Sequence, residues 1–355
     1  MRIRPHVSKS SVENFEGCQH KYFLEYNLGY RSDGSLKTNI GSAVHSVIEC
    51  LGLMKLEIQR HKKGEPNQKY TITDDLMGTW EFTEDELYVK RMISDSEVNA
   101  INASRANKTT YIDQKKIKPG YSRRGEDLIN RLAEKAKQVH LSDNMKPAEI
   151  RDYYNFIWMT LDEFDVRDYN VIAVEQNFDL EIAEDWAKLD DGGYVRIKGF
   201  VDLIVEIDGA YHIFDWKTGQ RKDFNTGKVK TLRCLKEDLQ LAMYSYALSQ
   251  LYPSIPIIAN ILYTRDGGLF TVIFDETVEK LVHHEVRKHV EAVRATEIPM
   301  LRDPKRYDYR CKNMCHFAKK NTFDDNICDC QFIASKIREL GLDQVEKEYS
   351  KPKEE

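Results

Sequence analysis

Two carboxylates and one ammonium group are predicted to meet on one face of a β-hairpin near the middle of this 355-residue chain. Residues 197–217 read IKGFVDLIVEIDGAYHIFDWK and alternate as two strands do. The Asp-Gly pair at 208–209 is typical of a type I′ turn, which needs positive φ at both central residues. With that turn, Asp202 lies opposite Asp215, and Lys217 points to the same face.

This arrangement favours metal-dependent phosphate chemistry. Directly opposed carboxylates repel each other, and a divalent cation between them removes the conflict. Oxygen ligands of this kind suit Mg²⁺ or Mn²⁺. A neighbouring lysine can stabilise the charge that develops on a phosphate under attack. The alternative is a solvated sheet face that carries an ordinary ion pair between Asp215 and Lys217.

The surrounding pattern predicts a mixed α/β fold. Helical spacing is present over 8–30, 38–60, 148–164, 236–252 and 276–296, and strand alternation over 170–182, 193–217 and 255–274, with a turn at 266–268. Residues 64–150 are polar and irregular, with helical patches, and indicate a mostly helical insert. The last residues, 341–355, carry both charge signs and are predicted to be a solvated tail.

The hairpin resembles the core motif of the PD-(D/E)XK nucleases in their RecB-like branch, where an aspartate strand precedes a hydrophobic-D-x-K strand. The resemblance extends over roughly 8–50 and 170–330. It implies a restriction-endonuclease-like central sheet flanked by helices. The implied organisation is N-terminal helices at 1–50, a helical insert at 51–165, a nuclease core at 166–300 and a Cys-rich metal-binding segment at 301–340.

Three further motifs follow the order of that branch. GSAVH ends at His45 and matches a G-x-x-x-H helix motif, whose histidine is a metal ligand in the family. QLAMY places Gln240 and Tyr244 on one helix face, as in the Q-x-x-x-Y motif. Glu175 precedes the aspartate strand and is a weaker candidate ligand. The resemblance implies phosphodiester hydrolysis with Mg²⁺ or Mn²⁺ held by Asp202, Asp215 and His45.

Seven cysteines include four within residues 311–330. Clustered cysteines more often bind metal than form disulfides inside cells. In some RecB-like nucleases one cysteine before the core and three after it hold a [4Fe–4S] cluster; Cys18, Cys311, Cys315 and Cys330, with Cys328 as a substitute, match that order. The C-x₃-C spacing and the long gap that follows it depart from the family pattern. A zinc site made only of the four late cysteines therefore remains the alternative.

The expected substrate is DNA, single-stranded or with free ends, bound through phosphates. Candidate contacts lie in two locally basic segments of a chain whose net charge is −5: Lys115, Lys116, Arg123, Arg124, Arg221 and Lys222. No Walker A motif is present, so a helicase or another recombination protein is a possible partner. An exonuclease of recombination or repair is the first interpretation, an endonuclease on the same core the second, and a non-catalytic DNA-end-binding module the third. Without a secretion signal or an apolar run long enough for a membrane, we expect a cytoplasmic protein.

Overall fold

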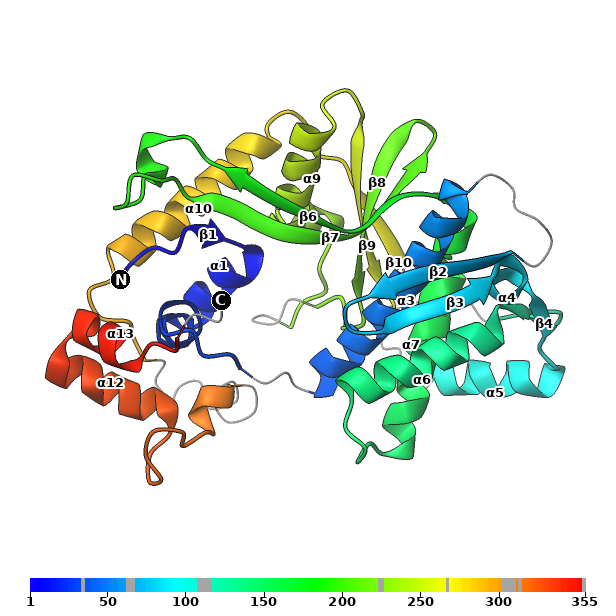
Figure 1. The fold of residues 1–355 in the computed structure, drawn as a ribbon, viewed down its shortest axis with the longest axis horizontal. Coiled ribbons are helices and arrows are strands. Elements are labelled where there is room, and N and C mark those ends of the chain that lie inside the picture. Colours follow the sequence, from blue (N-terminus) through cyan, green and yellow to red (C-terminus); the bar gives the residue numbers. More distant parts are fainter. Residues whose placement is uncertain are drawn as a thin grey trace. The chain divides into compact units, whose positions relative to one another are not determined.

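The computed structural model describes residues 1–32, 36–61, 68–106, 117–222, 227–265, 268–301, 311 and 315–352 (Figure 1). The chain forms two compact units. The first unit contains Met1–Ser35, Phe178–Gly199 and Glu276–Glu355, and the second contains Leu36–Asn177 and Phe200–Asp275. No helix in the described part of the chain is both long enough and apolar enough to cross a membrane.

The main sheet confirms the predicted mixed α/β class. Its strands are β1 (His6–Val7), β6 (Asn170–Glu181), β7 (Arg196–Ile207), β8 (Ala210–Lys217), β9 (Ile257–Tyr263) and β10 (Gly268–Val272). Strand β8 is antiparallel to β7 and parallel to β9, β10 is antiparallel to β9, and β6 pairs with β7. A parallel step from β8 to β9 requires a crossover connection, and helices α8 (Leu232–Lys236) and α9 (Leu239–Leu251) provide it.

The central hairpin has the predicted turn and register. Asp208 and Gly209 both have positive φ, 51° and 78°, as a type I′ turn requires. Ile207 pairs with Ala210, and the ladder continues to Leu203 opposite Phe214. One face of this hairpin packs into the apolar core of the second unit, to which Leu203, Val205, Phe214 and Trp216 contribute.

Helices α3 (Leu36–Arg60) and α7 (Pro147–Glu163) supply much of the same core. Helix α3 comes very close to the sheet at Gly52, where a Cβ atom would lie 3.0 Å from Val174 Cγ2. A second close approach is at Gly41, where a Cβ atom would lie 3.0 Å from Thr218 Oγ1. The two glycines therefore let one face of α3 lie directly against the strands that carry the candidate site.

The insert is less helical than the sequence indicated. It contains helices α4 (Glu84–Tyr88), α5 (Asp95–Ala106) and α6 (Glu126–His140), but also two small sheets, β2 (Lys69–Asp74) with β3 (Gly78–Thr83) and β4 (Lys90–Met92) with β5 (Ser122–Arg124). Strand β2 buries alternate residues, Tyr70 and Ile72, and so follows a period-two pattern that the sequence analysis did not use.

The first unit pairs the short strand β1 (His6–Val7) in parallel with the start of β7. The described helices of this unit are α1 (Lys9–Gly17), α2 (Gln19–Tyr22), a π-helical turn (Phe23–Asn27), α10 (Val278–Arg294), α12 (Asp329–Leu340) and α13 (Leu342–Tyr349). Short 3₁₀ turns lie at Asp185–Ala187 and His316–Ala318 in this unit. Another 3₁₀ turn lies at Val166–Asp168 in the second unit. The helix predicted over 8–30 is interrupted at Cys18, whose backbone is extended.

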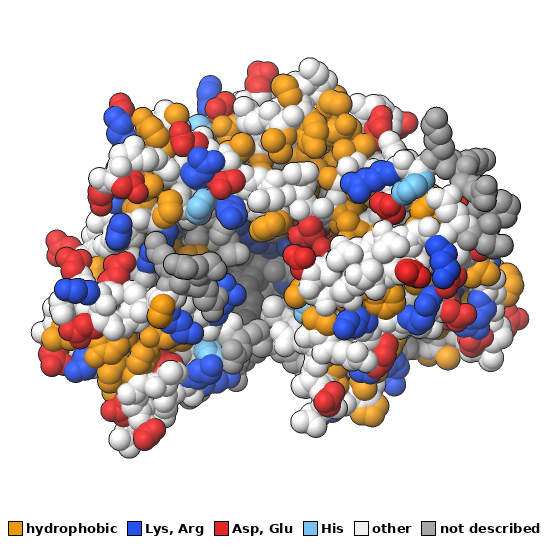
Figure 2. All heavy atoms as spheres, in the orientation of Figure 1, with side chains coloured by type: hydrophobic (Ala, Val, Ile, Leu, Met, Phe, Trp, Pro, Cys, Tyr) orange, Lys and Arg blue, Asp and Glu red, His pale blue; other side chains and the backbone are white. Residues whose placement is uncertain are grey.

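The expected solvated tail is wrong for residues 342–349, which form helix α13. Val345 is fully buried in an apolar cluster with residues of α12 and the π-helical turn, so the mixed charges lie on one face of an amphipathic helix. On the face of the molecule shown in Figure 2, acidic and basic side chains are interspersed.

Candidate active site

The candidate site lies where β7 and β8 separate. The regular ladder ends at Leu203 and Phe214, one residue before the two aspartates. At this point the Trp216 N–H donates to Asp202 Oδ2 at 3.3 Å, and Asp202 thus takes the place of a strand partner. Side chains from α3 and α9 contact β8 beyond this point, since His45 bonds the Trp216 carbonyl and Gln240 bonds Asp215.

Asp215 and Lys217 form the innermost pair. Asp215 is 2% exposed, and Lys217 Nζ lies 2.9 Å from its Oδ1 and 2.8 Å from its Oδ2. Gln240 donates from Nε2 to the same Oδ1 at 2.9 Å, while its Oε1 accepts from Lys217 at 3.1 Å. Gln240 Nε2 also lies 2.7 Å from the Tyr244 hydroxyl, so α9 contributes a connected polar pair.

His45 approaches from α3. Its Nε2 lies 2.8 Å from the Trp216 carbonyl oxygen, and its Nδ1 lies 3.5 Å from Asp202 Oδ2. The imidazole is about one-third exposed, so it borders both solvent and the aspartate.

Burial and neighbouring charges perturb the protonation of this group. Burial, reinforced by the charge of Asp215, raises the pKa of Asp202 to about 6, and His45 and Lys217 oppose that rise. Burial alone would lower the pKa of Lys217, but the carboxylate of Asp215 holds it above its usual value. The ammonium therefore stays charged and can act as a fixed positive group in the site.

Glu175 belongs to the same acidic surroundings. Burial, followed by the charge of Asp202, raises the pKa of Glu175 to about 7. Its backbone has φ 48°, a left-handed conformation that a non-glycine residue rarely adopts inside a strand. Such strain costs on the order of 1 kcal/mol and is concentrated at functional sites.

Glu49 and Asp74 also belong to this acidic group, although neither was predicted from the sequence. Glu49 lies one helical turn after His45 on α3, and its carboxyl group hydrogen-bonds Asp74 at the end of β2. Burial, followed by the charge of Glu175, raises the pKa of Glu49 to about 8. The i, i+4 spacing from His45 was a signal for Glu49. No comparable signal pointed to Asp74, because its segment was interpreted as irregular.

The donor set suits a hard divalent cation. Asp202 and Asp215 offer carboxylate oxygens, and His45 and the Trp216 carbonyl lie beside them. Burial, followed by neighbouring carboxylates, raises the pKa values of Glu49, Glu175 and Asp202, and a bound cation would favour their charged forms. As they stand, no three His, Cys, Asp or Glu side chains among the described residues are close enough to hold an ion. Lys217 and Gln240 both hydrogen-bond Oδ1 of Asp215, and Lys217 Nζ also lies 2.8 Å from Oδ2.

Several cysteines of the first unit lie close to one another. The Sγ of Cys315 accepts hydrogen bonds from the Cys330 thiol and from the backbone of Phe317 and Ala318. Cys18 and Cys328 lie close enough to Cys330 to interact with it electrostatically, so the four cysteines lie in one region. Cys18 caps α2, where its sulfur accepts from the Lys21 N–H at 3.5 Å. Cys311 is half-buried, and no disulfide forms among the described cysteines. Outside this group, Cys50 is buried in the core of the second unit and Cys234 is exposed.

Most of the predicted phosphate contacts already have partners within the chain. Arg123 lies over the Trp158 ring at 4.4 Å and pairs with Glu126 at 3.0 Å. Arg124 pairs with two carboxylates, Asp165 and Asp168.

The remaining candidates divide into two groups. Arg221 stacks over the Phe270 ring at 4.2 Å, and Lys222 forms an isolated β-bridge with Val229. Lys115 and Lys116 lie outside the described residues. A role in DNA binding stays a prediction for all six basic residues.

Comparison with known proteins identifies the superfamily. The sequence pattern of the PD-(D/E)XK nuclease superfamily matches residues 6–319. The chain belongs to this superfamily. Strands β7 and β8 of this PD-(D/E)XK protein carry Asp202 and the Asp215-Trp216-Lys217 triplet.

Two solved structures that match the chain are remote likenesses. A protein from Eubacterium rectale, provisionally described as an exonuclease, is 12% identical with a TM-score of 0.39; the match covers 81% of this chain and 80% of that one. A protein designated SSO0001 is 16% identical with a TM-score of 0.28, over 78% of this chain and 96% of that one. No curated protein matches the chain.

Proposed function

We propose that this protein is a Mg²⁺- or Mn²⁺-dependent DNA nuclease of the RecB-like branch, acting as an exonuclease on DNA ends in recombination or repair. The observation that carries the proposal is the group formed by Asp202, Asp215 and Lys217, to which α3 adds His45 and α9 adds Gln240. Superfamily membership supports a phosphodiester bond as the target.

Each of these side chains has a role that its contacts support. Asp202, Asp215 and His45 would hold the divalent ion. When bound, the ion supplies a water of lowered pKa and neutralises charge on the phosphate. Lys217 remains protonated beside Asp215 and can stabilise the negative charge that develops on the phosphate. Gln240 bonds both partners of that pair, and thereby fixes the direction in which the ammonium points.

The test is cleavage of end-labelled DNA by single variants. Asp202→Ala, Asp215→Ala and Lys217→Ala should each abolish cleavage, while the circular dichroism spectrum stays that of the unaltered chain. Lys69→Ala is a matched control, because this lysine is 73% exposed and forms only a surface pair with Glu81. Near-normal cleavage by any of the three site variants would remove the assignment.

We also propose a metal centre in the first unit, a [4Fe–4S] cluster with zinc as the alternative. The convergence of Cys18 with Cys315, Cys328 and Cys330 supports a centre that includes the early cysteine, as the cluster requires. The N–H groups that donate to the Cys315 sulfur suit a charged thiolate ligand.

Anaerobic purification with iron, sulfide and zinc analysis tests this centre. Iron and sulfide in equal amounts, lost in Cys18→Ser but kept in Cys234→Ser, would support the cluster; Cys234 is exposed and serves as the control. Zinc that survives Cys18→Ser would instead indicate the local site of late cysteines.

A further inference from the structure

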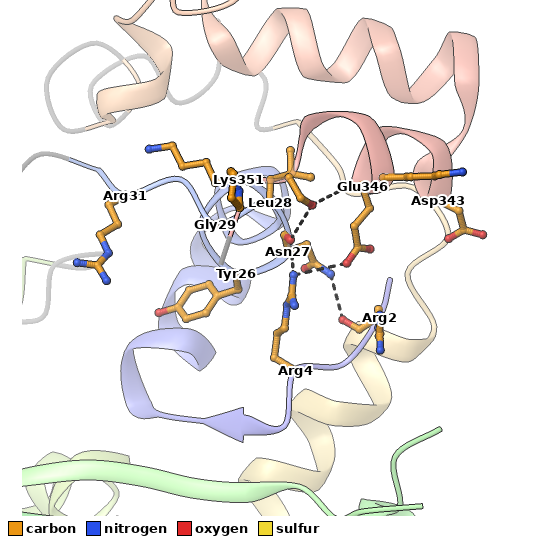
Figure 3. Close-up of a pocket in the computed structure, with 13 residues that line it drawn as sticks. Arg2, Arg4, Tyr26, Asn27, Leu28, Gly29, Arg31, Asp343, Glu346 and Lys351 are labelled. Atoms are coloured by element: carbon orange, nitrogen blue, oxygen red, sulfur yellow. Dashed lines mark hydrogen bonds and ion pairs between the residues drawn. The ribbon is translucent and has the colours of Figure 1, made fainter. Parts of the chain in front are cut away.

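A pocket of about 860 Å³ lies in the first unit, and three segments that are far apart in the sequence line it (Figure 3). They are the N-terminal residues around Arg4, the end of the π-helical turn with the residues up to Arg31, and α13 with the residues that follow it. The volume is within the range of ligand pockets, roughly 300–1,000 Å³.

Hydrogen bonds between these segments hold the pocket in shape. The Lys351 N–H donates to the Leu28 carbonyl at 2.8 Å, and the Tyr30 hydroxyl donates to the Tyr349 carbonyl at 2.8 Å. Gly29 lies between these bonds with φ +77°, a conformation that suits glycine. The pocket wall is thus a defined structure, because the end of the chain is tied to residues 28–30.

The lining carries an excess of positive charge. Five of the lining residues are cationic, Arg2, Arg4, Arg31, Lys347 and Lys351, and two are acidic, Asp343 and Glu346, which leaves three positive charges on a chain of net charge −5.

Within the described parts of the chain, an acidic side chain pairs with one of the five cations, Arg4. Arg4 points toward Asn27 and Glu346 in Figure 3, with Nη2 3.5 Å from Glu346 Oε1. The other four are exposed and form no ion pair among the described residues. Like charges that line one pocket repel each other, and an anionic ligand would relieve that repulsion.

The floor of the pocket also has unused hydrogen-bonding capacity. Asn27 is 1% exposed; its Nδ2 donates to the Arg2 carbonyl, but its Oδ1 has no hydrogen-bond partner among the described residues. Arg4 Nε is likewise buried without a partner. A buried polar atom without a hydrogen-bond partner costs about 1–3 kcal/mol of folding free energy. Such atoms are few in native proteins, and a bound water, ion or ligand group is one explanation for them.

We infer that this pocket binds phosphates of a single DNA strand, as a contact separate from the residues of the candidate active site. Exposed arginine and lysine side chains around an open pocket suit the phosphodiester backbone, which carries a charge at every nucleotide. The inference rests on the proposed function only in taking DNA as the ligand. Arg31 and Lys351, both exposed in the lining (Figure 3), would be the main contacts; Lys351 Nζ also lies over the Tyr30 ring, 5.1 Å from its centroid.

The test is binding of a fluorescent single-stranded oligonucleotide by the full chain in EDTA, measured by anisotropy over a range of salt concentrations. Each phosphate contact to a single strand contributes about 0.7 to the slope of log K against log salt, or about fivefold at 0.1 M. The double variant Arg31→Ala, Lys351→Ala should therefore bind about 25-fold more weakly at 0.1 M, with a slope shallower by about 1.4.

Lys280→Ala is the control, since this lysine is exposed on α10 of the same unit and lies outside the pocket lining. Unchanged affinity and slope in the double variant, with its melting temperature preserved, would overturn the inference. If the unaltered chain binds no DNA, the inference fails as well. Cleavage assays on the unaltered chain then decide separately whether the proposed function fails.

Discussion

Replacement of Glu49 by glutamine is expected to stabilise the protein, and to do so more at pH 7 than at pH 5. Glu49 is partly buried beside Glu175, Asp74 and Asp202, and these surroundings raise its pKa to about 8. In the unfolded chain its pKa is close to 4.5. Between these two values the unfolded chain loses a proton that the folded chain retains, so stability falls as pH rises from 4.5 to 8. Glutamine is neutral throughout and can still donate to Asp74.

The size of the effect follows from the two pKa values. One pKa unit corresponds to about 1.36 kcal/mol, so the protonated Glu49 costs about 3 kcal/mol at pH 7 and under about 1 kcal/mol at pH 5. Because solvent screens the exposed part of the side chain, we expect a gain of about 2 kcal/mol at pH 7. In a unit of this size that is roughly 4–8 °C in melting temperature.

Urea and thermal unfolding in EDTA, at pH 5 and pH 7, measure this difference. Glu57→Gln is the matched control, because Glu57 lies on the same helix, pairs with Arg60 at 3.6 Å and should change stability by less than about 0.5 kcal/mol. A Glu49→Gln variant that is destabilised, or stabilised equally at both pH values, would refute the reasoning.

Three further predictions concern metal binding, acid stability and packing. Added Mg²⁺ should raise the melting temperature more at pH 7.5 than at pH 5.5, because protons on Asp202 (pKa about 6) and Glu175 (pKa about 7) compete with the ion at low pH; equal shifts in calorimetry at both values would contradict this. Burial lowers the pKa of His289 from 6.5 to about 4 in the folded protein. As pH falls, the unfolded chain therefore binds a proton at this histidine before the folded chain does. The free energy of unfolding should decrease by about 2 kcal/mol between pH 7 and pH 5. Urea titrations of His289→Leu should show that much less pH dependence, and an identical dependence would exclude the histidine. Gly52→Val should cost about 1–3 kcal/mol by thermal unfolding, since even a Cβ atom there would crowd the sheet; an unchanged melting temperature would mean that α3 can move away.

The hairpin could be predicted to the residue because its turn leaves little freedom. Asp208 and Gly209 specify the turn type, the turn specifies the register, and the period of two then places Asp202, Asp215 and Lys217 on one face. The end of the ladder just before the two aspartates could not be predicted. It depends on a hydrogen bond from the Trp216 N–H to the Asp202 side chain, and this contact forms only in the folded structure.

Other features were missed for physical reasons of their own. The β2–β3 hairpin is short and edge-like, and its alternation is weak among charged residues. Helix α13 could not be predicted, because a short amphipathic helix with one fully buried valine has the same composition as a solvated segment. The pairing of Arg124 with Asp165 and Asp168 joins residues about forty positions apart, so the basic segment alone suggested more available charge than the fold leaves.

Cleavage of end-labelled linear and circular DNA by the unaltered chain, in Mn²⁺ and in EDTA, tests the central claim most directly. A metal-dependent exonuclease should release nucleotides from linear DNA in Mn²⁺, leave the circle intact, and do neither in EDTA. Cutting of the circle would keep the nuclease but replace the exonuclease by an endonuclease. Binding without any cleavage in Mn²⁺ would contradict the account, since Asp202, Asp215 and Lys217 would then be assembled without catalysing the reaction.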